Sequence, residues 1–153
     1  MKKSNLGLIG AGLLAVLTLA SPPVPAMESA EDCLARAIYF EARDDGPAGM
    51  EAVASVVINR VKHSEFPDEI CAVVKEGGEQ PPCQFSWWCD GKSDQPENAE
   101  AWAEAVEIAR RWVSSPPADP TGDALYFHQA GAEAPFHEDR ELVAEVGSHL
   151  FYR

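Results

Sequence analysis

One glutamate in the chain stands where a carboxyl group can do acid–base chemistry. Glu41 follows two aromatic residues in the stretch IYFEARDDG, and its spacing places it on the apolar face of a helix. Burial disfavours the charged form of a carboxyl group and so raises its pKa. An acid that keeps its proton near neutral pH can donate it to a leaving group and later take one back. The alternative is a structural ion pair between Glu41 and a basic residue such as Arg43 or Arg60.

A second group of residues combines flat aromatic rings with hydrogen-bonding side chains. The stretch CQFSWWCDG carries Gln84, Phe85, Ser86, Trp87 and Trp88 between two cysteines. Sugar rings stack on aromatic faces, and a loop this rich in aromatic residues commonly packs over something or binds something. The alternative is that the rings fill the core of a small domain. We expect at least one of the two tryptophans to be part of the core.

The chain contains four cysteines: Cys33, Cys71, Cys83 and Cys89. An even number in an exported protein favours disulfides. Four cysteines allow three pairings, and the sequence does not decide among them. We favour Cys83–Cys89, which closes the tryptophan loop, and Cys33–Cys71, which joins two helices. The spacing contains no Cys-x-x-Cys pair, and this argues against a zinc cluster.

Three histidines raise the question of a metal site. His128 ends one expected strand and His149 begins another, so these two can approach each other, and His137 lies between them. Three histidines can hold a zinc ion, as in metal-dependent amidases. No close pair of histidines on a helix supports this, so we expect structural or hydrogen-bonding histidines and neither a metal nor a cofactor. A serine nucleophile has less support, because there is no Gly-x-Ser-x-Gly motif.

Apolar residues at helical spacing predict the elements that position these side chains. Four helices are expected: from Ser29 to the break DDGPAG, from Pro47 to about His63, a short one within residues 65–74, and one from Pro96 to about Val113. Ser29 is placed to cap the first helix, and Asp68 to cap the third. Residues 77–95 are expected to form a loop.

The C-terminal part predicts strands. ALYFH (Ala124–His128) and SHLFYR (Ser148–Arg153) are expected to pair antiparallel, with the acidic segment between them as a loop. The sequence shows no repeat and no second domain. The expected fold class is therefore α+β, mainly helical with a small antiparallel β-hairpin near the C-terminus.

The first 26 residues have the three-part pattern of a secretory signal peptide. Two lysines precede an apolar run from Leu6 to Ala20, and small residues end at Ala26. The run is shorter than the roughly 20 residues of a membrane-spanning helix. We therefore expect one exported domain at residues 27–153, located in the periplasm or cell envelope or secreted. A retained membrane anchor is the alternative.

The charge of the chain excludes several classes of partner. There are 25 acidic and 12 basic residues, which give a formal net charge of −13. Such a surface repels nucleic-acid phosphates and is not steered towards an anionic membrane or wall polymer. We expect a monomer with no nucleic-acid partner and no membrane association once the signal peptide is removed. An anionic substrate would need a local cleft.

Four blocks of the sequence, taken in order, resemble the cell wall hydrolase SleB family. They are CLARAIYFEARDDGPAGMEAVASVVINRVKHSEFP, CQFSWWCDG, ADPTGDALYFH and GSHLFYR, and they extend from about Cys33 to Arg153. The resemblance implies a lysozyme-like, mainly helical α+β domain that acts on the glycan strands of peptidoglycan. It also implies a lytic transglycosylase whose general acid/base is the glutamate of the EAR block, which is Glu41 here.

The implied reaction uses one essential acid. Glu41 would protonate the bridging oxygen after N-acetylmuramic acid and then deprotonate the hydroxymethyl group of the same sugar, which leaves a 1,6-anhydro end. The residues expected to line the sugar groove are Gln84, Phe85, Ser86, Trp87, Tyr126, His128 and His149.

Two positions depart from the pattern of the family. Asp44-Asp45-Gly46 stands where the family usually has Gly-Glu-Pro, and this makes Asp45 a candidate second acid. Gly147-Ser148-His149 stands where the family usually has Gly-Asn-His. Three alternatives stay open: a muramidase-type hydrolase in which Asp44 or Asp45 assists water, a zinc-dependent N-acetylmuramoyl-L-alanine amidase, and a non-catalytic wall-binding module.

Overall fold

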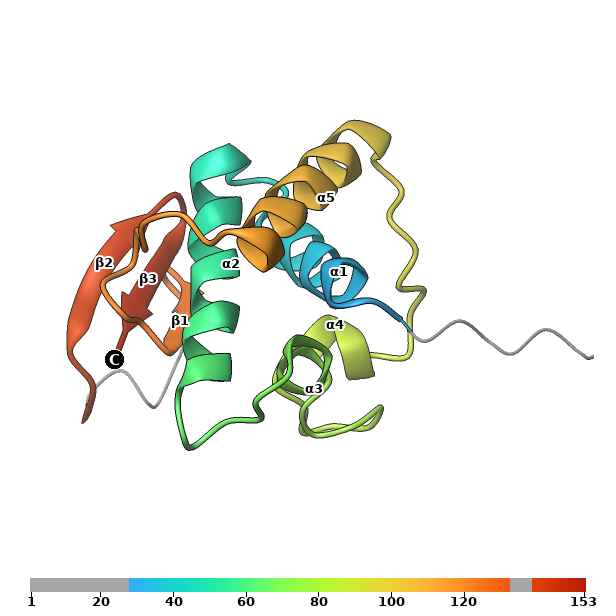
Figure 1. Ribbon diagram of the computed structural model, residues 1–153. Coiled ribbons are helices and arrows are strands. Elements are labelled where there is room, and N and C mark those ends of the chain that lie inside the picture. Colours follow the sequence, from blue (N-terminus) through green and yellow to red (C-terminus); the bar gives the residue numbers. More distant parts are fainter. Residues whose placement is uncertain (1–27, 133–138) are drawn as a thin grey trace, which may run out of the picture.

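The computed structural model describes residues 28–132 and 139–153, in which helices stand against a small antiparallel sheet (Figure 1). The helices are α1 (Ala30–Ala42), α2 (Gly46–Lys62), α3 (Ile70–Val74), α4 (Ser86–Cys89) and α5 (Ala99–Ser114), and the strands are β1 (Tyr126–Gln129), β2 (Leu142–Val146) and β3 (His149–Tyr152). The expected mainly helical α+β class is confirmed. The expected signal peptide and His137 lie outside the described residues.

The ends of α1 follow from local chemistry. The hydroxyl of Ser29 accepts a hydrogen bond from the backbone N–H of Asp32, so the expected cap is confirmed. The helix ends at Ala42, and Gly46 takes a positive φ of 67°, a conformation that favours glycine. Pro47 then stands in the first turn of α2, where its missing N–H costs nothing.

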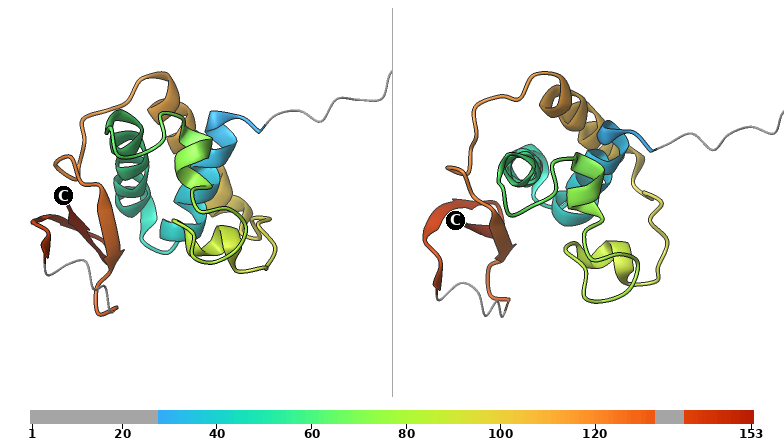
Figure 2. Two further views of the ribbon diagram at one scale, coloured as in Figure 1. Left: turned by 90° about the horizontal axis from the view of Figure 1, so that it is seen from below. Right: turned by 60° about the horizontal axis from the view of Figure 1, so that its bottom comes forward.

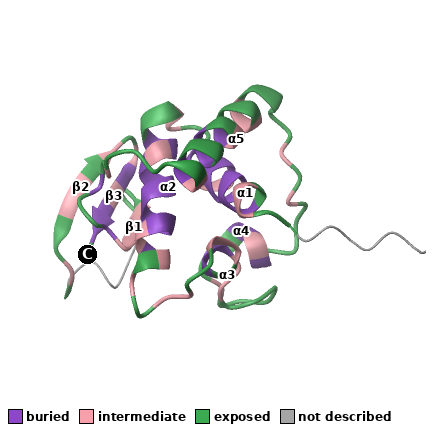
Figure 3. Cartoon of the chain, in the orientation of Figure 1, coloured by how far each residue is buried: buried purple, intermediate pink, exposed green. Residues whose placement is uncertain are grey.

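The main core lies between α1, α2 and α5, whose inward faces are buried (Figure 3). α1 packs against both other helices and against α3. Largest among the fully buried apolar side chains of this core are Trp112, Tyr39, Leu34, Ile38, Met50 and Ile108. Burial of this apolar surface is the main driving force that holds the three long helices together.

Two helix starts differ from the sequence prediction. α5 begins at Ala99 and not at Pro96, because Asn98 caps it by accepting hydrogen bonds from two backbone N–H groups. The Tyr39 hydroxyl also accepts the backbone N–H groups of Glu97 and Asn98, which fixes the start of α5 against α1. The predicted cap by Asp68 is wrong, since Glu69 takes the N-cap position of α3 and neither side chain bonds there.

The sheet has the order β1-β3-β2, with both neighbouring pairs antiparallel. The predicted pairing of β1 with β3 is confirmed, and it sets Tyr126 opposite Tyr152. The prediction of a plain loop between them is wrong, because β2 forms there and adds a third strand. Phe151 on β3 packs into a small second core with Ala52 and Val56 of α2.

Two disulfides tie the helical part together. Cys33–Cys71 joins α1 to α3, and Cys83–Cys89 closes the loop that contains α4. Both are the pairings that the sequence analysis favours. The predicted loop at 77–95 therefore holds one short helical turn. Within the described ranges, no helix is long and apolar enough to cross a membrane.

Candidate active site

Glu41 lies in the last turn of α1, at the junction with α2. In both views of Figure 2 this end of α1 lies between β1 and the segment around α4. The Glu41 side chain is partly buried. The fold therefore brings the two segments chosen as sugar-binding candidates to either side of the candidate acid.

Burial raises the pKa of the Glu41 carboxyl to about 7, and the positive charge of Arg60 acts against this shift. Neither basic residue considered as a partner forms an ion pair with Glu41 in the described part of the chain. Arg43 lies 3.8 Å from the Asp44 carboxylate and stacks over the Tyr39 ring instead. A carboxyl group with a pKa near 7 is partly protonated at neutral pH, so it can both donate and accept a proton.

Arg60, predicted from the sequence only as a possible ion-pair partner of Glu41, is a buried cation. Its side chain is 2% exposed, and burial lowers its pKa to about 10. Its Nε donates a hydrogen bond to the backbone oxygen of Leu125 at 2.7 Å. The guanidinium carbon lies 5.3 to 6.0 Å from three ring centroids, those of Phe66, Phe85 and Tyr126. Such stacking and hydrogen bonding stabilise a cation that has left water.

The tryptophan loop, which the disulfide Cys83–Cys89 closes, contacts the Arg60 guanidinium directly. The amide oxygen of Gln84, in the orientation that its neighbours require, accepts hydrogen bonds from both terminal guanidinium nitrogens at 3.1 Å. Phe85 is buried against the same group, while Ser86 is exposed at the start of α4. Arg60 therefore links three of the predicted site residues, namely Gln84, Phe85 and Tyr126, and it interacts electrostatically with Glu41.

The two tryptophans of the loop have different surroundings. Trp87 is buried and stacks on Phe40 with the ring centroids 5.0 Å apart, so the expectation of one core tryptophan is confirmed. Trp88 is only partly buried. Trp87 therefore packs on the residue that directly precedes the candidate acid in α1, as part of the core.

The strand residues divide between the two faces of the sheet. His128 bonds through Nε2 to the Tyr152 hydroxyl at 3.0 Å, and Tyr126 lies under the guanidinium of Arg140. His149 pairs in register with Gln129, one position along from His128. Adjacent positions face opposite sides of a strand, so the expectation that His128 and His149 approach each other is wrong.

Asp45 is held by the turn before β3. One carboxylate oxygen accepts the backbone N–H of Ser148 at 3.1 Å, and the other lies 2.6 Å from Nδ1 of the buried His149. Burial pushes the pKa of Asp45 upwards, but the hydrogen bonds from Ser148 and His149 outweigh it and lower the pKa. Asp45 and Ser148, which both replace residues usual in the family, therefore contact each other, and this contact joins the start of α2 to the sheet.

A second carboxylate fixes the entry to β1. Asp119 accepts hydrogen bonds from the backbone N–H groups of Thr121 and Asp123, from the Thr121 hydroxyl and from the Asn59 amide, at 2.7 to 2.9 Å. Burial opposes ionisation, but these bonds lower the pKa of Asp119 to about 2. The block ADPTGDALYFH thus anchors β1 to α2 and positions Tyr126.

The described residues contain no group of three or more histidine, cysteine, aspartate or glutamate side chains that could hold a metal ion. Sequence reasoning names Arg60 as a possible partner of Glu41 but misses its burial and its contacts with Gln84, Phe85 and Tyr126. One signal for its burial is present, since Arg60 follows the buried Val56 and Val57 at helical spacings of four and three residues.

A family model described as Cell Wall Hydrolase matches residues 44–152, so its first matched residue lies three positions after Glu41. The chain is 31% identical over 119 residues to a spore cortex-lytic enzyme of Bacillus cereus, covering 77% of this chain and 42% of that protein. The enzyme of the same name from Bacillus subtilis is 30% identical over 119 residues, with 77% and 35% covered. The chain thus spans less than half the length of these relatives.

Two solved structures are similar in fold. One is the catalytic domain of the germination-specific lytic transglycosylase SleB from Bacillus anthracis, with a TM-score of 0.64, 28% identity, and 86% of this chain and 100% of that chain covered. The other is the catalytic domain of the Bacillus cereus SleB protein, with a TM-score of 0.61, 30% identity, and 85% and 95% covered. The expected lysozyme-like fold is consistent with both.

Proposed function

This chain belongs to the Cell Wall Hydrolase family, and we propose that it is an exported enzyme that cleaves the glycan strands of peptidoglycan after N-acetylmuramic acid. The similarity to two SleB catalytic domains, over 100% and 95% of their length, supports the substrate class. The observation that carries the chemistry is the partly buried Glu41 carboxyl with a pKa of about 7, close enough to the buried Arg60 for its charge to act on that pKa.

In the first step, Glu41 acts as general acid. Its protonated carboxyl donates to the bridging oxygen of the glycosidic bond, and that bond breaks with the electron pair leaving on the oxygen. Positive charge develops on the sugar ring as the bond breaks. At the same moment the Glu41 carboxyl becomes an anion, and the nearby cation Arg60 stabilises this charged form.

In the second step, Glu41 acts as general base. It takes the proton of the hydroxymethyl group of the same N-acetylmuramic acid, and the freed oxygen attacks the anomeric carbon. The product ends in a 1,6-anhydro sugar, no water is consumed, and Glu41 regains its proton. A single carboxyl group therefore completes the cycle. The engagement of both Asp45 oxygens with Ser148 and His149 favours this one-acid scheme over hydrolysis assisted by Asp45.

Gln84 and Tyr126 are proposed to border the sugar groove, because both contact Arg60, whose charge acts on Glu41. Phe85 is buried and supports them by packing on the same guanidinium. Ser86 and His128 would add hydrogen-bonding groups at its edges. His149 contributes through Asp45, as a positioning group between α2 and the sheet.

Mass spectrometry of the digestion products tests this function. Peptidoglycan is incubated with the full chain and, in parallel, with Glu41→Gln. The proposal predicts fragments that end in anhydro-muramic acid and are one water lighter than reducing ends, and it predicts none with the variant. Reducing ends would indicate a muramidase, cleavage of the amide bond between N-acetylmuramic acid and the peptide stem an amidase, and binding to wall sheets without fragments a wall-binding module.

Export is a separate part of the proposal. Residues 1–26 are proposed to be a signal peptide that is removed, which leaves the domain 27–153 in the periplasm or cell envelope. The intact mass of the protein recovered from the cell envelope tests this. A mass that begins at Met27 agrees with the proposal, and the mass of the uncleaved chain contradicts it.

A further inference from the structure

Residues 90–98 connect α4 to α5 on the side of α1 away from the sheet (Figure 1). Two hollows lie between residues of this segment and of α1. One hollow, of about 230 Å³, is lined by Phe40, Arg43, Trp87, Asp90, Lys92 and Asp94. The other, of about 480 Å³, is lined by Glu28, Asp32, Arg36, Lys75, Trp88 and Asp94. Asp94 lines both, so we treat them as one groove and call it the α1 groove.

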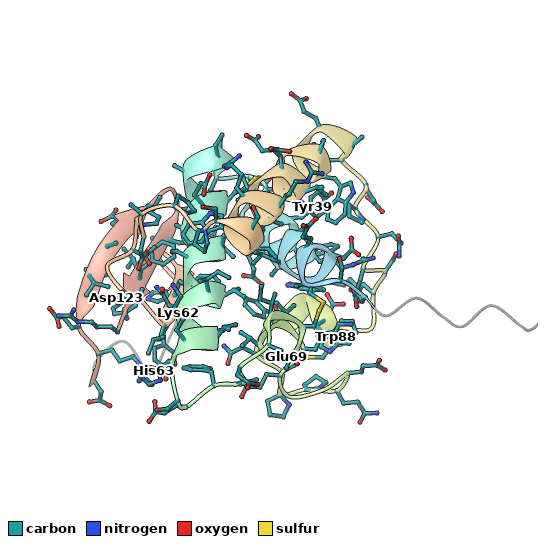
Figure 4. The ribbon with its side chains drawn as sticks, in the orientation of Figure 1. Tyr39, Lys62, His63, Glu69, Trp88 and Asp123 are labelled. Carbon is teal, nitrogen blue, oxygen red and sulfur yellow. A yellow bond between two sulfur atoms is a disulfide. The ribbon has the colours of Figure 1, made fainter. Side chains whose placement is uncertain are left out.

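Aromatic rings form a continuous wall of the α1 groove. Phe40 stacks on Trp87 at 5.0 Å, and Trp87 meets Trp88 edge to face at 6.2 Å. Figure 4 shows Trp88 beside α3 and α4, where the ammonium of Lys75 lies 4.5 Å from its ring centroid. A wall of this kind can pack against the backbone and short side chains of an extended ligand.

The charges of the α1 groove differ from those of the protein as a whole. The chain has 25 acidic against 12 basic residues, whereas the groove has equal numbers of each. Its four basic residues are Arg36, Arg43, Lys75 and Lys92, and its four acidic residues are Glu28, Asp32, Asp90 and Asp94. A ligand that carries both carboxylates and amines suits such a lining, and a polyanion does not.

The α1 groove begins next to the candidate acid. Arg36, Phe40 and Arg43 recur at helical spacing along one side of α1, and Phe40 directly precedes Glu41. Consecutive helix residues project about 100° apart, so the Glu41 side chain leaves α1 on a different side from the groove, and a ligand that contacts both must pass round the C-terminal end of α1.

We propose that the α1 groove binds the peptide stem of the N-acetylmuramic acid whose glycosidic bond is cleaved. This rests on the proposed function, because the stem is attached to that sugar. A stem carries free carboxylates and, where its third residue is a diamino acid, an amine. In the free protein Lys92 lies 3.4 Å from the Asp90 carboxylate. On binding, this exposed ion pair opens: Arg43 and Lys92 hold the carboxylates, Asp90 and Asp94 hold the amine, and the backbone lies along the aromatic wall.

Cleavage of matched strands tests the proposal. Peptidoglycan strands with stems are compared with the same strands stripped of stems by an amidase. The full chain is expected to cleave stem-bearing strands with a kcat/KM about tenfold higher than that for stem-free strands. This factor corresponds to the free energy of about one charge-assisted contact between the groove and the stem. In the double variant Arg43→Gln/Lys92→Gln the ratio of the two rates is expected to fall towards one. Both side chains are substantially exposed, so the fold tolerates the change.

Lys62→Gln is the matched control. Lys62 is an exposed basic residue at the end of α2, near Asp123 and away from Trp88 (Figure 4), and the ratio is expected to stay unchanged. Equal cleavage of the two substrates by the full chain, or a preference that survives the double variant, overturns the stem site while the proposed function stands.

Direct binding of a stem peptide tests the α1 groove independently of the proposed glycan cleavage. A free stem peptide is titrated into the full chain while the indole N–H resonance of Trp88, assigned with Trp88→Phe, is followed by NMR. The Trp88 indole nitrogen is buried without a hydrogen-bond partner in the described residues, so packing changes at the ring shift its resonance. A saturable shift that the double variant weakens supports the site even if no strand is cleaved. No shift at millimolar stem overturns it.

Discussion

Oδ2 of Asp45 lies 2.6 Å from Nδ1 of His149, and this contact joins the residue before α2 to the first residue of β3. The other oxygen of Asp45 accepts the backbone N–H of Ser148. The sheet is thereby fixed against the helix that carries Arg60. The residue chosen from the sequence as a candidate second acid thus has a structural task.

Asp45→Ala is expected to lower the free energy of unfolding by about 2 kcal/mol, because it leaves the partners on Ser148 and His149 unsatisfied. Asp44→Ala is the matched control, since the side chain of Asp44 is 95% exposed, and it should change stability by less than about 0.5 kcal/mol. Urea unfolding of the three proteins measures this. Equal effects of the two substitutions would show that the contact with His149 does not stabilise the fold.

Asp45→Asn separates the structural task from a chemical one. The amide keeps the shape of the side chain and can still accept a hydrogen bond. We expect cleavage of peptidoglycan to stay within about tenfold of wild type, whereas loss of a general base would reduce the rate by about 10²- to 10⁴-fold. A fall of about 10²-fold or more in the cleavage rate of a folded Asp45→Asn protein would instead favour hydrolysis assisted by Asp45.

Asp119→Ala is expected to destabilise the chain by about 2 to 3 kcal/mol, because four donors around Asp119 lose their acceptor. The folded pKa of Asp119 is about 2, below its usual value. Its stabilising effect is therefore fully present above pH of about 4 and is lost as the pH falls towards 2. Unfolding at pH 7 and pH 2 measures this, with the exposed Asp68→Ala as control. A difference from wild type that stays constant with pH contradicts it.

The pH dependence of cleavage reports on Glu41. The pKa of its carboxyl is raised to about 7, and the first step needs the protonated form. We expect the rate on peptidoglycan to fall above pH of about 7, roughly tenfold for each further pH unit. A rate that stays level up to pH 9 would be incompatible with Glu41 as the acid.

Arg60→Met tests the buried cation. The positive charge of Arg60 lowers the pKa of Glu41, so removing it should raise this pKa and move the decline of the rate to higher pH. Arg60→Lys keeps a charge and should keep the decline close to its wild-type position. A purely structural role predicts a lower rate for Arg60→Met at every pH with no movement of the decline.

The sequence predicted the parts of the fold that rest on local patterns. Periodicity located α1, α2 and α5, and the Ser29 cap followed from side-chain chemistry. β2 was missed because it is a short edge strand with most of its residues at least partly exposed, including Leu142 at 52%. Val143, Ala144 and Val146 pack only partly against the second core, and the irregular pairing between Leu142 and Ala144 breaks the apolar alternation.

The site was predicted less completely than the fold. The position of Glu41 on the apolar side of α1 followed from spacing, and so did the choice of the loop with Gln84 and Phe85. The role of Arg60 did not, because its partners Phe85, Leu125 and Tyr126 come from segments far away in the sequence. A lone arginine near a helix end is more often solvated, and only the tertiary structure shows that this one is buried.

The most direct test of the central claim is the rate of glycan cleavage by Glu41→Gln, measured beside wild type and Glu31→Gln. Glu31 lies in the first turn of the same helix and serves as the matched control. Loss of the general acid should reduce the rate by at least about 10²-fold in a folded protein, while Glu31→Gln retains wild-type activity. Wild-type cleavage by Glu41→Gln would contradict the assignment of Glu41 as the catalytic acid.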